Sequence, residues 1–149
     1  MEIGKEIKQN KFKNEHQKML INILFTSNWL NAIHANSLKP FGISSQQYNL
    51  LRILRGQHPK PASVNLLIDR MLDKSSNASR LVEKLRLKKL LERTICPEDR
   101  RAVNVIITQK GLDLLAELDK NESAIFKELK NVSEKEAEQM NSLLDKLRG

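Results

Sequence analysis

The sequence predicts a mainly helical fold with one small β-hairpin, and three observations lead to that class. Apolar residues recur at the helical period along most of the chain. Two neighbouring stretches, 90–95 and 102–107, favour strands, and the second places Val103, Val105 and Ile107 at a period of two. The 149 residues, 40% hydrophobic and 30% charged, suit one water-soluble domain. No apolar run exceeds three residues, so we expect no membrane span and a cytoplasmic protein.

The first two predicted helices are joined by a short connector. Apolar residues at helical spacing indicate a long helix over 12–38. Pro40 and Gly42 end it, because proline resists helical continuation and glycine accepts turn geometry. Ser44 and Gln47 then fit a capping box, which starts a second and shorter helix.

The next two predicted helices flank a polar turn. Ser63 caps a short third helix, and the segment 73–76 interrupts the apolar rhythm after it. We expect Ser75 and Ser76 to cap the fourth helix. Its apolar residues, Ala78, Leu81, Val82 and Leu85, cluster on one side of the helix. The opposite side is polar and carries Ser76, Ser79, Arg80, Glu83 and Arg86, with Asn77 and Lys84 on a flank.

A charged loop and two further helices complete the chain. Residues 96–101 are turn-prone and would project from the tip of the hairpin. Thr108 caps one long amphipathic helix that is predicted to reach Leu129. Ser133 and Glu136 form a second capping box and start the last helix, whose apolar spacing of three and four suits packing on another helix.

Positive charge is concentrated in the middle of the chain. There are 26 Lys and Arg residues against 18 Asp and Glu residues, a net charge of +8. Residues 1–69 carry +5, residues 70–110 carry +6, and residues 111–149 carry −3. A local basic block favours a polyanionic partner, since neutralising phosphates releases counterions. A merely solvated basic face would have the same composition, so the residue pattern must decide.

The order of the predicted elements is that of a winged helix-turn-helix, which binds DNA. The leading end of the fourth helix would meet base edges in the major groove. Arginine can bridge two acceptors on guanine, asparagine can match adenine, and serine can contact several bases or a phosphate. The candidate DNA-binding residues on this helix and the turn before it are Ser75, Ser76, Asn77, Ser79, Arg80 and Lys84. The hairpin loop would bring Arg100 and Arg101 near a minor groove.

These residues also carry a resemblance to a known family. The stretch from Asp73 to Leu85, then Asp99-Arg100-Arg101, and then Ile107 to Gly111 resemble the MarR family of bacterial transcription regulators, and the resemblance covers nearly the whole chain. It implies a homodimer, most often a repressor, that binds a roughly palindromic operator. Residues 12–38 and 109–148 would form the dimerisation helices, and residues 44–108 the DNA-binding lobe.

The resemblance also assigns roles to the hairpin loop, which is the wing of the fold. The family's Asp-x-Arg signature falls on Asp99 and Arg101, so Arg101 is expected in the minor groove and Asp99 is expected to hold it by an ion pair. Arg100 would add a phosphate contact. The chain departs from the family at Lys89, where many members have glycine, so the end of the recognition helix is expected to differ in shape.

Family members often bind small aromatic or anionic compounds in a cleft between the dimer layer and the DNA-binding lobe. The candidate ligand contacts here are Trp29, His34, Tyr48 and Arg52, which offer flat apolar surface and hydrogen-bond donors for a ring that carries a carboxylate. Residues of these types are more often part of the core or of the plain surface than ligand contacts.

Other chemistry has little support in the sequence. Cys96 stands at the base of the wing, where oxidation would disturb DNA contact, but a structural or incidental thiol is the favoured interpretation. The three histidines are scattered, so neither a metal site nor a cofactor is expected. No catalytic motif is present, which argues against an enzyme. The alternative to a DNA-binding regulator is a small helical adaptor that holds an acidic protein through its basic lobe.

Overall fold

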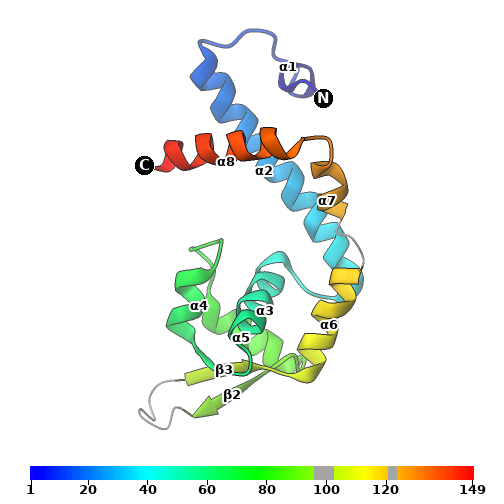
Figure 1. The fold of residues 1–149 in the computed structure, drawn as a ribbon, viewed down its shortest axis with the longest axis vertical. Coiled ribbons are helices and arrows are strands. Elements are labelled where there is room, and N and C mark those ends of the chain that lie inside the picture. Colours follow the sequence, from blue (N-terminus) through cyan, green and yellow to red (C-terminus); the bar gives the residue numbers. More distant parts are fainter. Residues whose placement is uncertain (96–102, 121–123) are drawn as a thin grey trace.

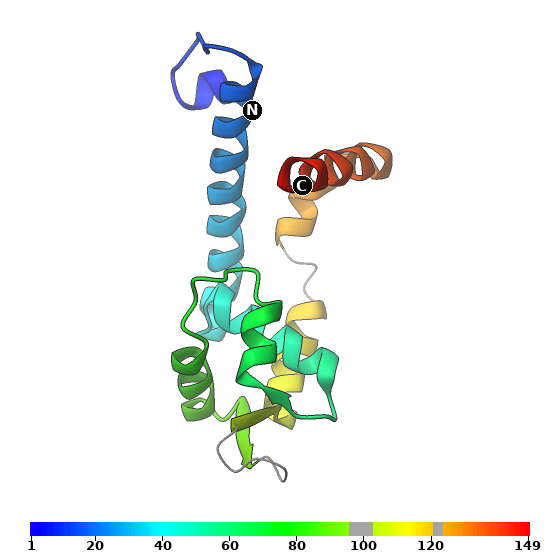
Figure 2. The same cartoon turned by 90° about the vertical axis from the view of Figure 1, so that its left-hand side faces the viewer.

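A computed structural model describes residues 1–95, 103–120 and 124–149, and its dominant feature is one long helix with different surroundings at its two ends. The long helix is α2 (Glu15–Leu38), and a short helix, α1 (Ile3–Glu6), precedes it. Figure 1 shows a lobe of short helices and a small sheet at the lower end of α2. Figure 2 shows the two last helices to one side of the upper part of α2. This arrangement separates a lobe of short helices and a small sheet from a layer of helices.

Local capping explains where the first helices begin and end. The side chain of Asn14 accepts a hydrogen bond from the Gln17 amide at 2.9 Å, so α2 starts slightly later than predicted. It ends in a 3-10 turn, η1 (Lys39–Phe41), and Gly42 follows in the left-handed conformation at φ 65°. The predicted breaker is confirmed. The predicted capping box of Ser44 and Gln47 is also present and starts α3 (Ser45–Gln57).

Two short helices follow α3 and carry the predicted helix-turn-helix. The side chain of Ser63 accepts from the Leu66 amide and starts α4 (Val64–Arg70), as predicted. The next helix, α5 (Ala78–Leu87), corresponds to the predicted recognition helix. Both helices pack on α3 and on each other.

The predicted hairpin is part of a three-stranded antiparallel sheet. β2 (Leu91–Ile95) pairs with β3 (Val103–Ile107), with Leu91 opposite Ile107. A third strand, β1 (Ala62–Ser63), pairs with the other edge of β3, so the strand order is β1-β3-β2. Sequence periodicity missed β1, because two residues are too few to show an alternation.

The stretch from Thr108 to Leu129, which was expected to form one long helix, contains two described helices, α6 (Gln109–Lys120) and α7 (Ala124–Leu129). Residues 121–123 between them lie outside the described residues, so the continuity of the predicted helix stays a prediction. The last helix, α8 (Glu134–Arg148), begins at the predicted capping box of Ser133 and Glu136.

In the part of the chain that the structure describes, the hydrophobic core cluster is centred on the lobe and includes the adjoining ends of α2 and α6. It extends from Leu38, the last residue of α2, to Leu115 in α6, and includes Leu50, Leu85 and Val105. By contrast, none of the residues of α8, all of which the structure describes, is buried. Among the described residues, no helix combines the length and the apolar character that crossing a bilayer requires.

Candidate nucleic-acid interface

The α5 helix has one buried face and one exposed polar face. Ala78, Val82 and Leu85 are buried against the lobe. Ser79, Arg80 and Lys84 are exposed on the other side. The separation of faces predicted from helical periodicity is therefore present in the structure.

The turn before α5 is organised by Asp73. Its carboxylate accepts hydrogen bonds from the Ser75 amide at 3.0 Å, from Ser75 Oγ at 2.6 Å and from Ser76 Oγ at 2.9 Å. The hydrogen bond from the Ser75 side chain is the main reason that the pKa of Asp73 lies below its ordinary value. Asp73 is thus ionised at neutral pH and fixes both serine hydroxyls.

The expected capping role of these serines is wrong, because Asn77 caps the helix. Its Oδ1 accepts from the Arg80 amide at 3.0 Å, and Ala78 is the first helical residue. Asparagine directly before the first apolar helical residue is among the strongest N-cap signals, and it was present in the sequence. The serine hydroxyls donate to Asp73 instead, since a carboxylate is a stronger acceptor than their alternatives in the turn.

These hydrogen bonds restrict what the turn can offer to DNA. A hydroxyl has one hydrogen, so Ser75 and Ser76 can only accept from a base while they donate to Asp73. The Oδ1 of Asn77 is engaged by the helix, which leaves its amide hydrogens as donors. Arg80 and Lys84 are exposed and lie on the first turns of α5, where a groove-binding helix meets the bases.

One carboxylate, Glu83, connects the recognition helix to the wing. It accepts from Arg86 at 2.8 Å and forms an ion pair with Arg93 of β2 at 3.0 Å. The hydrogen bond from Arg86 is the main cause that lowers the pKa of Glu83. Sequence reasoning placed Glu83 on the polar face but did not find this bridge, because the partner strand lies ten residues further along the chain.

The junction between α5 and β2 is shaped by Lys89, the position at which the chain departs from the family pattern. Lys89 adopts a left-handed conformation with φ 59°, which glycine adopts at lower cost. The Leu90 amide donates to the Leu85 carbonyl at 3.0 Å and closes the helix end. Thr108 stabilises this junction with two hydrogen bonds. Its amide donates to the Leu90 carbonyl, and its hydroxyl donates to the Lys89 carbonyl. The same hydroxyl accepts from Gly111 and caps α6, as predicted.

The predicted wing residues lie in the segment that the structure leaves out. Cys96, Asp99, Arg100 and Arg101 all fall within 96–102, outside the described residues. Their roles in the minor groove, in phosphate contact and in oxidant sensing stay predictions. The base of the wing is described, and there Arg93 is paired with Glu83.

Three of the four candidate ligand contacts gather at the junction of α2 and α3. The His34 and Tyr48 rings meet edge to face, with centroids 5.1 Å apart. Arg52 donates to Tyr48 Oη at 3.3 Å. A cavity of about 590 Å³ opens between α2, the start of α3 and residues 71–73. His34 and Tyr48 line this cavity, whereas Trp29 and Arg52 are not among its lining residues.

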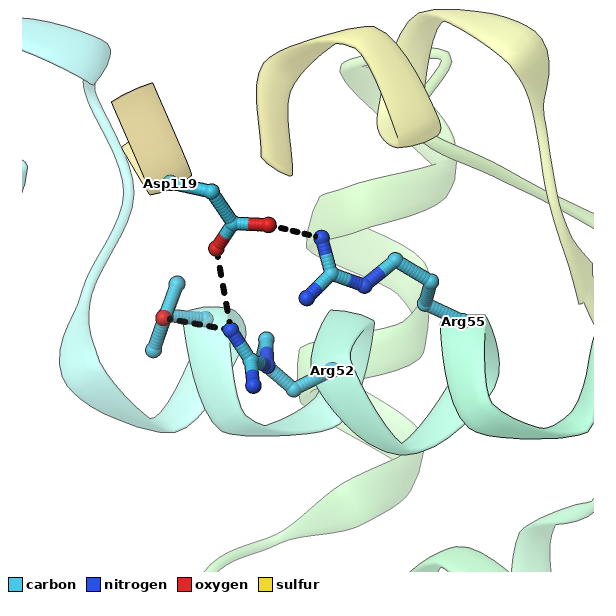
Figure 3. Close-up of polar contacts among 4 residues, drawn as sticks. Arg52, Arg55 and Asp119 are labelled. Carbon is cyan, nitrogen blue, oxygen red and sulfur yellow. Dashed lines mark hydrogen bonds and ion pairs between the residues drawn. The ribbon is translucent and has the colours of Figure 1, made fainter. Parts of the chain in front are cut away.

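Arg52 belongs to an ion cluster that sequence analysis did not predict (Figure 3). Asp119, near the end of α6, accepts from Arg52 at 3.0 Å and from Arg55 at 2.5 Å. The three side chains are partly exposed, so the cluster acts mainly as a positioning contact between α3 and α6. Their separation of more than sixty residues left no local signal in the sequence.

Comparison with known proteins identifies the architecture. A model of the MarR family matches residues 41–102, which include α3 to β2. The HTH-type transcriptional regulator MhqR of Bacillus subtilis is 30% identical over 107 residues, which are 71% of this chain and 72% of that protein. The chain belongs to the MarR family. Membership in the MarR family makes it a DNA-binding transcription regulator, and the adaptor hypothesis has no support among these relatives.

Solved structures confirm the winged helix-turn-helix fold of this MarR-family chain. A mutant MarR from E. coli, complexed with operator DNA, matches with a TM-score of 0.79 at 22% identity, over 93% of this chain and 99% of that one. BpsR of Bordetella bronchiseptica, from a structure that addresses regulation of its DNA binding by 6-hydroxynicotinic acid, matches with a TM-score of 0.75 at 22% identity, over 89% of this chain and 99% of that one. At these identities the matches establish the fold alone.

Proposed function

We propose that this protein is a ligand-responsive repressor that binds a palindromic operator as a homodimer. The observation that carries the proposal is α5: its inner face is buried in the lobe core, and Ser79, Arg80 and Lys84 are exposed on its outer face. A helix held in this way can enter a major groove without disturbing the fold. Arg80 is the residue best placed to contact guanine, because its side chain is exposed on the first turn of the helix.

The wing completes the proposed interface. Its sequence motif assigns Arg101 to the minor groove, Asp99 to an ion pair with Arg101, and Arg100 to a phosphate. The Glu83–Arg93 ion pair joins the base of the wing to the recognition helix, which is consistent with both elements facing the same duplex.

The homodimer is supported by apolar surface on the helices outside the lobe. The side chains of Met19, Leu20 and Leu24 on α2, Leu129 on α7, and Met140, Leu143 and Leu147 on α8 are all more than 40% exposed. A groove of about 730 Å³ between α2 and α8 includes Met19, Met140 and Leu144 in its walls. Exposed apolar surface of this extent marks an interaction site. A second copy of the chain, with its own α2 and α8, is the partner that we propose.

Ligand response is supported by the cavity beside His34 and Tyr48, because one of its walls leads directly into the turn before α5. The structural neighbour BpsR, whose DNA binding is regulated by 6-hydroxynicotinic acid, provides a precedent for a small effector on this fold. A ligand that binds the DNA-incompatible arrangement more tightly would release the operator.

The direct test is a titration of the 149-residue chain against DNA that flanks its own gene, monitored by fluorescence anisotropy. Arg80→Ala should weaken binding by roughly 5- to 150-fold, the equivalent of a lost base contact, and should relax the preference at particular base pairs. Arg101→Ala should weaken binding on all sequences. Arg148→Ala, which removes an exposed arginine at the end of α8, is the matched control and should change little. Equal affinities for all three variants would refute the proposed interface.

A further inference from the structure

The two serines before α5 have hydroxyl hydrogens that are already engaged within the protein. Ser75 Oγ donates to Asp73 Oδ1 at 2.6 Å, and Ser76 Oγ donates to Asp73 Oδ2 at 2.9 Å. A hydroxyl has a single hydrogen, so neither serine can donate to a second group while these bonds last. Both oxygens keep lone pairs. The two side chains therefore face their surroundings as hydrogen-bond acceptors only.

The Asp73 carboxylate is a stronger acceptor than any group that DNA bases offer. The hydrogen bond from the Ser75 side chain is the main cause that lowers the pKa of Asp73, so the group is charged at neutral pH. Hydrogen bonds to a charged acceptor are roughly twice as strong as those between neutral groups. A neutral keto oxygen of a base would not draw the hydroxyl hydrogens away from Asp73.

Contacts with α3 and α5 hold this turn from both sides. The Leu72 amide donates to Asn49 Oδ1 of α3 at 3.0 Å, and the side chain of Gln46 in α3 also forms a hydrogen bond with Asp73. On the other side, Asn77 caps α5 directly after the serines. The serine oxygens thus have a set position relative to the recognition helix, one exposed and the other half-buried.

An oxygen that only accepts distinguishes two classes of base in the major groove. Adenine and cytosine present an amino group there, whereas thymine and guanine present a keto oxygen. The amino group donates to such an oxygen, but the keto oxygen meets it with a second lone pair and forms no bond. Exchanging adenine for cytosine keeps the donor in place, and exchanging either for its pairing partner removes it.

We infer that Asp73 is a positioning residue for base selection: by holding the hydroxyl hydrogens of Ser75 and Ser76, it makes the turn select adenine or cytosine over thymine or guanine at the operator positions that these serines contact. The inference rests on the proposed function, because it needs α5 in a major groove. It adds the chemical class of base and the residue that sets it.

Selection from a library of randomised operators, followed by sequencing, tests the preference with the 149-residue chain. The positions to read are those whose base preference disappears in Ser75→Ala or in Ser76→Ala. At these positions wild type should favour adenine and cytosine together by roughly fivefold or more. A preference for thymine or guanine there would overturn the inference, and so would the absence of any position that depends on the serines.

Asp73→Asn tests the part that Asp73 has in the selection. An amide has one acceptor oxygen in place of two, so at least one serine regains a free hydrogen and can donate to a keto oxygen. The amino preference should shrink to about twofold or less at one serine-dependent position or at both. Asp69→Asn removes the same charge from an exposed residue of α4 and should keep the full preference. An unchanged preference in Asp73→Asn, or an equal loss in Asp69→Asn, would contradict the inference.

The contacted amino group can also be removed from the DNA. Purine in place of a selected adenine, or 2-pyrimidinone in place of a selected cytosine, lacks only that group. Wild type should lose about threefold to tenfold in affinity, measured by fluorescence anisotropy. The double variant Ser75→Ala, Ser76→Ala should lose nothing further on the same DNA. An equal loss in both proteins would show that the amino group is not bound by the serines.

A measurement without DNA tests the hydrogen bonds on which the selection depends. In a carbon-13 NMR titration of the free chain, the pKa of Asp73 should be lower in wild type than in the double serine variant. Equal pKa values would overturn the inference whatever the protein binds. If wild type enriches no operator at all, the proposed function fails and the inference with it. If it enriches an operator that does not depend on the serines, only the inference fails.

Discussion

The lobe and the terminal helices of this chain differ in how much of their own surface they bury. In the lobe, α3, α5 and the sheet enclose leucines that are fully buried, such as Leu50 and Leu91. On α8, Met140 and Leu143 are more than half exposed, although this helix is capped as well as any in the lobe. Helix formation and burial are therefore separate properties: local capping fixes α8, but its apolar face needs a partner.

The largest effect is expected in the lobe core. Leu85→Ala should lower the free energy of unfolding by about 2–5 kcal/mol, because Leu85 is completely buried and its removal leaves a cavity. Leu87→Ala, two residues further on in the same helix, is the control: its side chain is 68% exposed, and the change should stay within about 0.5 kcal/mol. Urea unfolding at one protein concentration measures both. Similar losses in the two variants would contradict the assigned faces of α5.

The second largest effect on stability is expected at the contact between α6 and the base of the wing. A Cβ at position 111 would lie 2.3 Å from the Leu90 carbonyl oxygen and 2.7 Å from Ile107 Cγ1, so Gly111→Ala forces the backbone apart. We expect a loss of about 1–3 kcal/mol in thermal unfolding. Gly56→Ala has open space around the new methyl group and lies in a helix, so it should be neutral or gain up to about 1 kcal/mol. A loss of stability of similar size in both variants would contradict the close approach of Gly111 to Leu90 and Ile107.

The third effect is smaller and is a gain in stability, expected at the end of the recognition helix. Lys89→Gly should raise the free energy of unfolding by up to about 1 kcal/mol, because relief of the left-handed backbone, worth roughly 1–2 kcal/mol, exceeds the added freedom of the unfolded chain. Lys89→Ala keeps the Cβ and should bring no such gain. A stability of Lys89→Gly at or below that of Lys89→Ala would mean that residue 89 is not left-handed.

The smallest effect is expected at the ion cluster between α3 and α6. Asp119→Asn should cost at most about 1 kcal/mol at low salt, and the difference should fade as salt rises, because the side chains of Arg52 and Asp119 are both more than 40% exposed. Asp113→Asn, also on α6, is the control without an arginine partner in the described part of the chain. A loss that is as large at high salt as at low salt would show that the cluster is more than a screened surface contact.

Signals that lie close together in the sequence predicted most of the fold. The capping boxes at Ser44 and Ser133, the breaker at Gly42 and the alternation in β3 each occupy a few neighbouring residues, and all are present. The Ser63 and Thr108 caps belong to the same class. Such features depend on local geometry, so they do not require knowledge of the tertiary structure.

The sequence-based predictions are wrong where two groups compete for the same hydrogen bond. They missed contacts between residues that lie on separate elements. Ser75 and Ser76 were expected to cap α5, but Asp73 competes for their hydroxyls and Asn77 takes the cap. The Arg52–Asp119 and Glu83–Arg93 contacts join separate elements, so no spacing rule could reveal them. The exposed side of α5 was predictable because helical periodicity alone separates its two faces.

The contrast between lobe and terminal helices is tested most directly by the molar mass in solution, measured by light scattering at micromolar concentration. Wild type should have twice the 17.2 kDa mass of one chain. The double variant Met140→Glu, Leu147→Glu places charge on the apolar face of α8 and should reduce the mass to that of a single chain. The control Asn141→Glu, Ser142→Glu adds the same charge on other faces of α8 and should leave the dimer intact. A wild type with the mass of one chain, or an unchanged mass in the first double variant, would contradict the account.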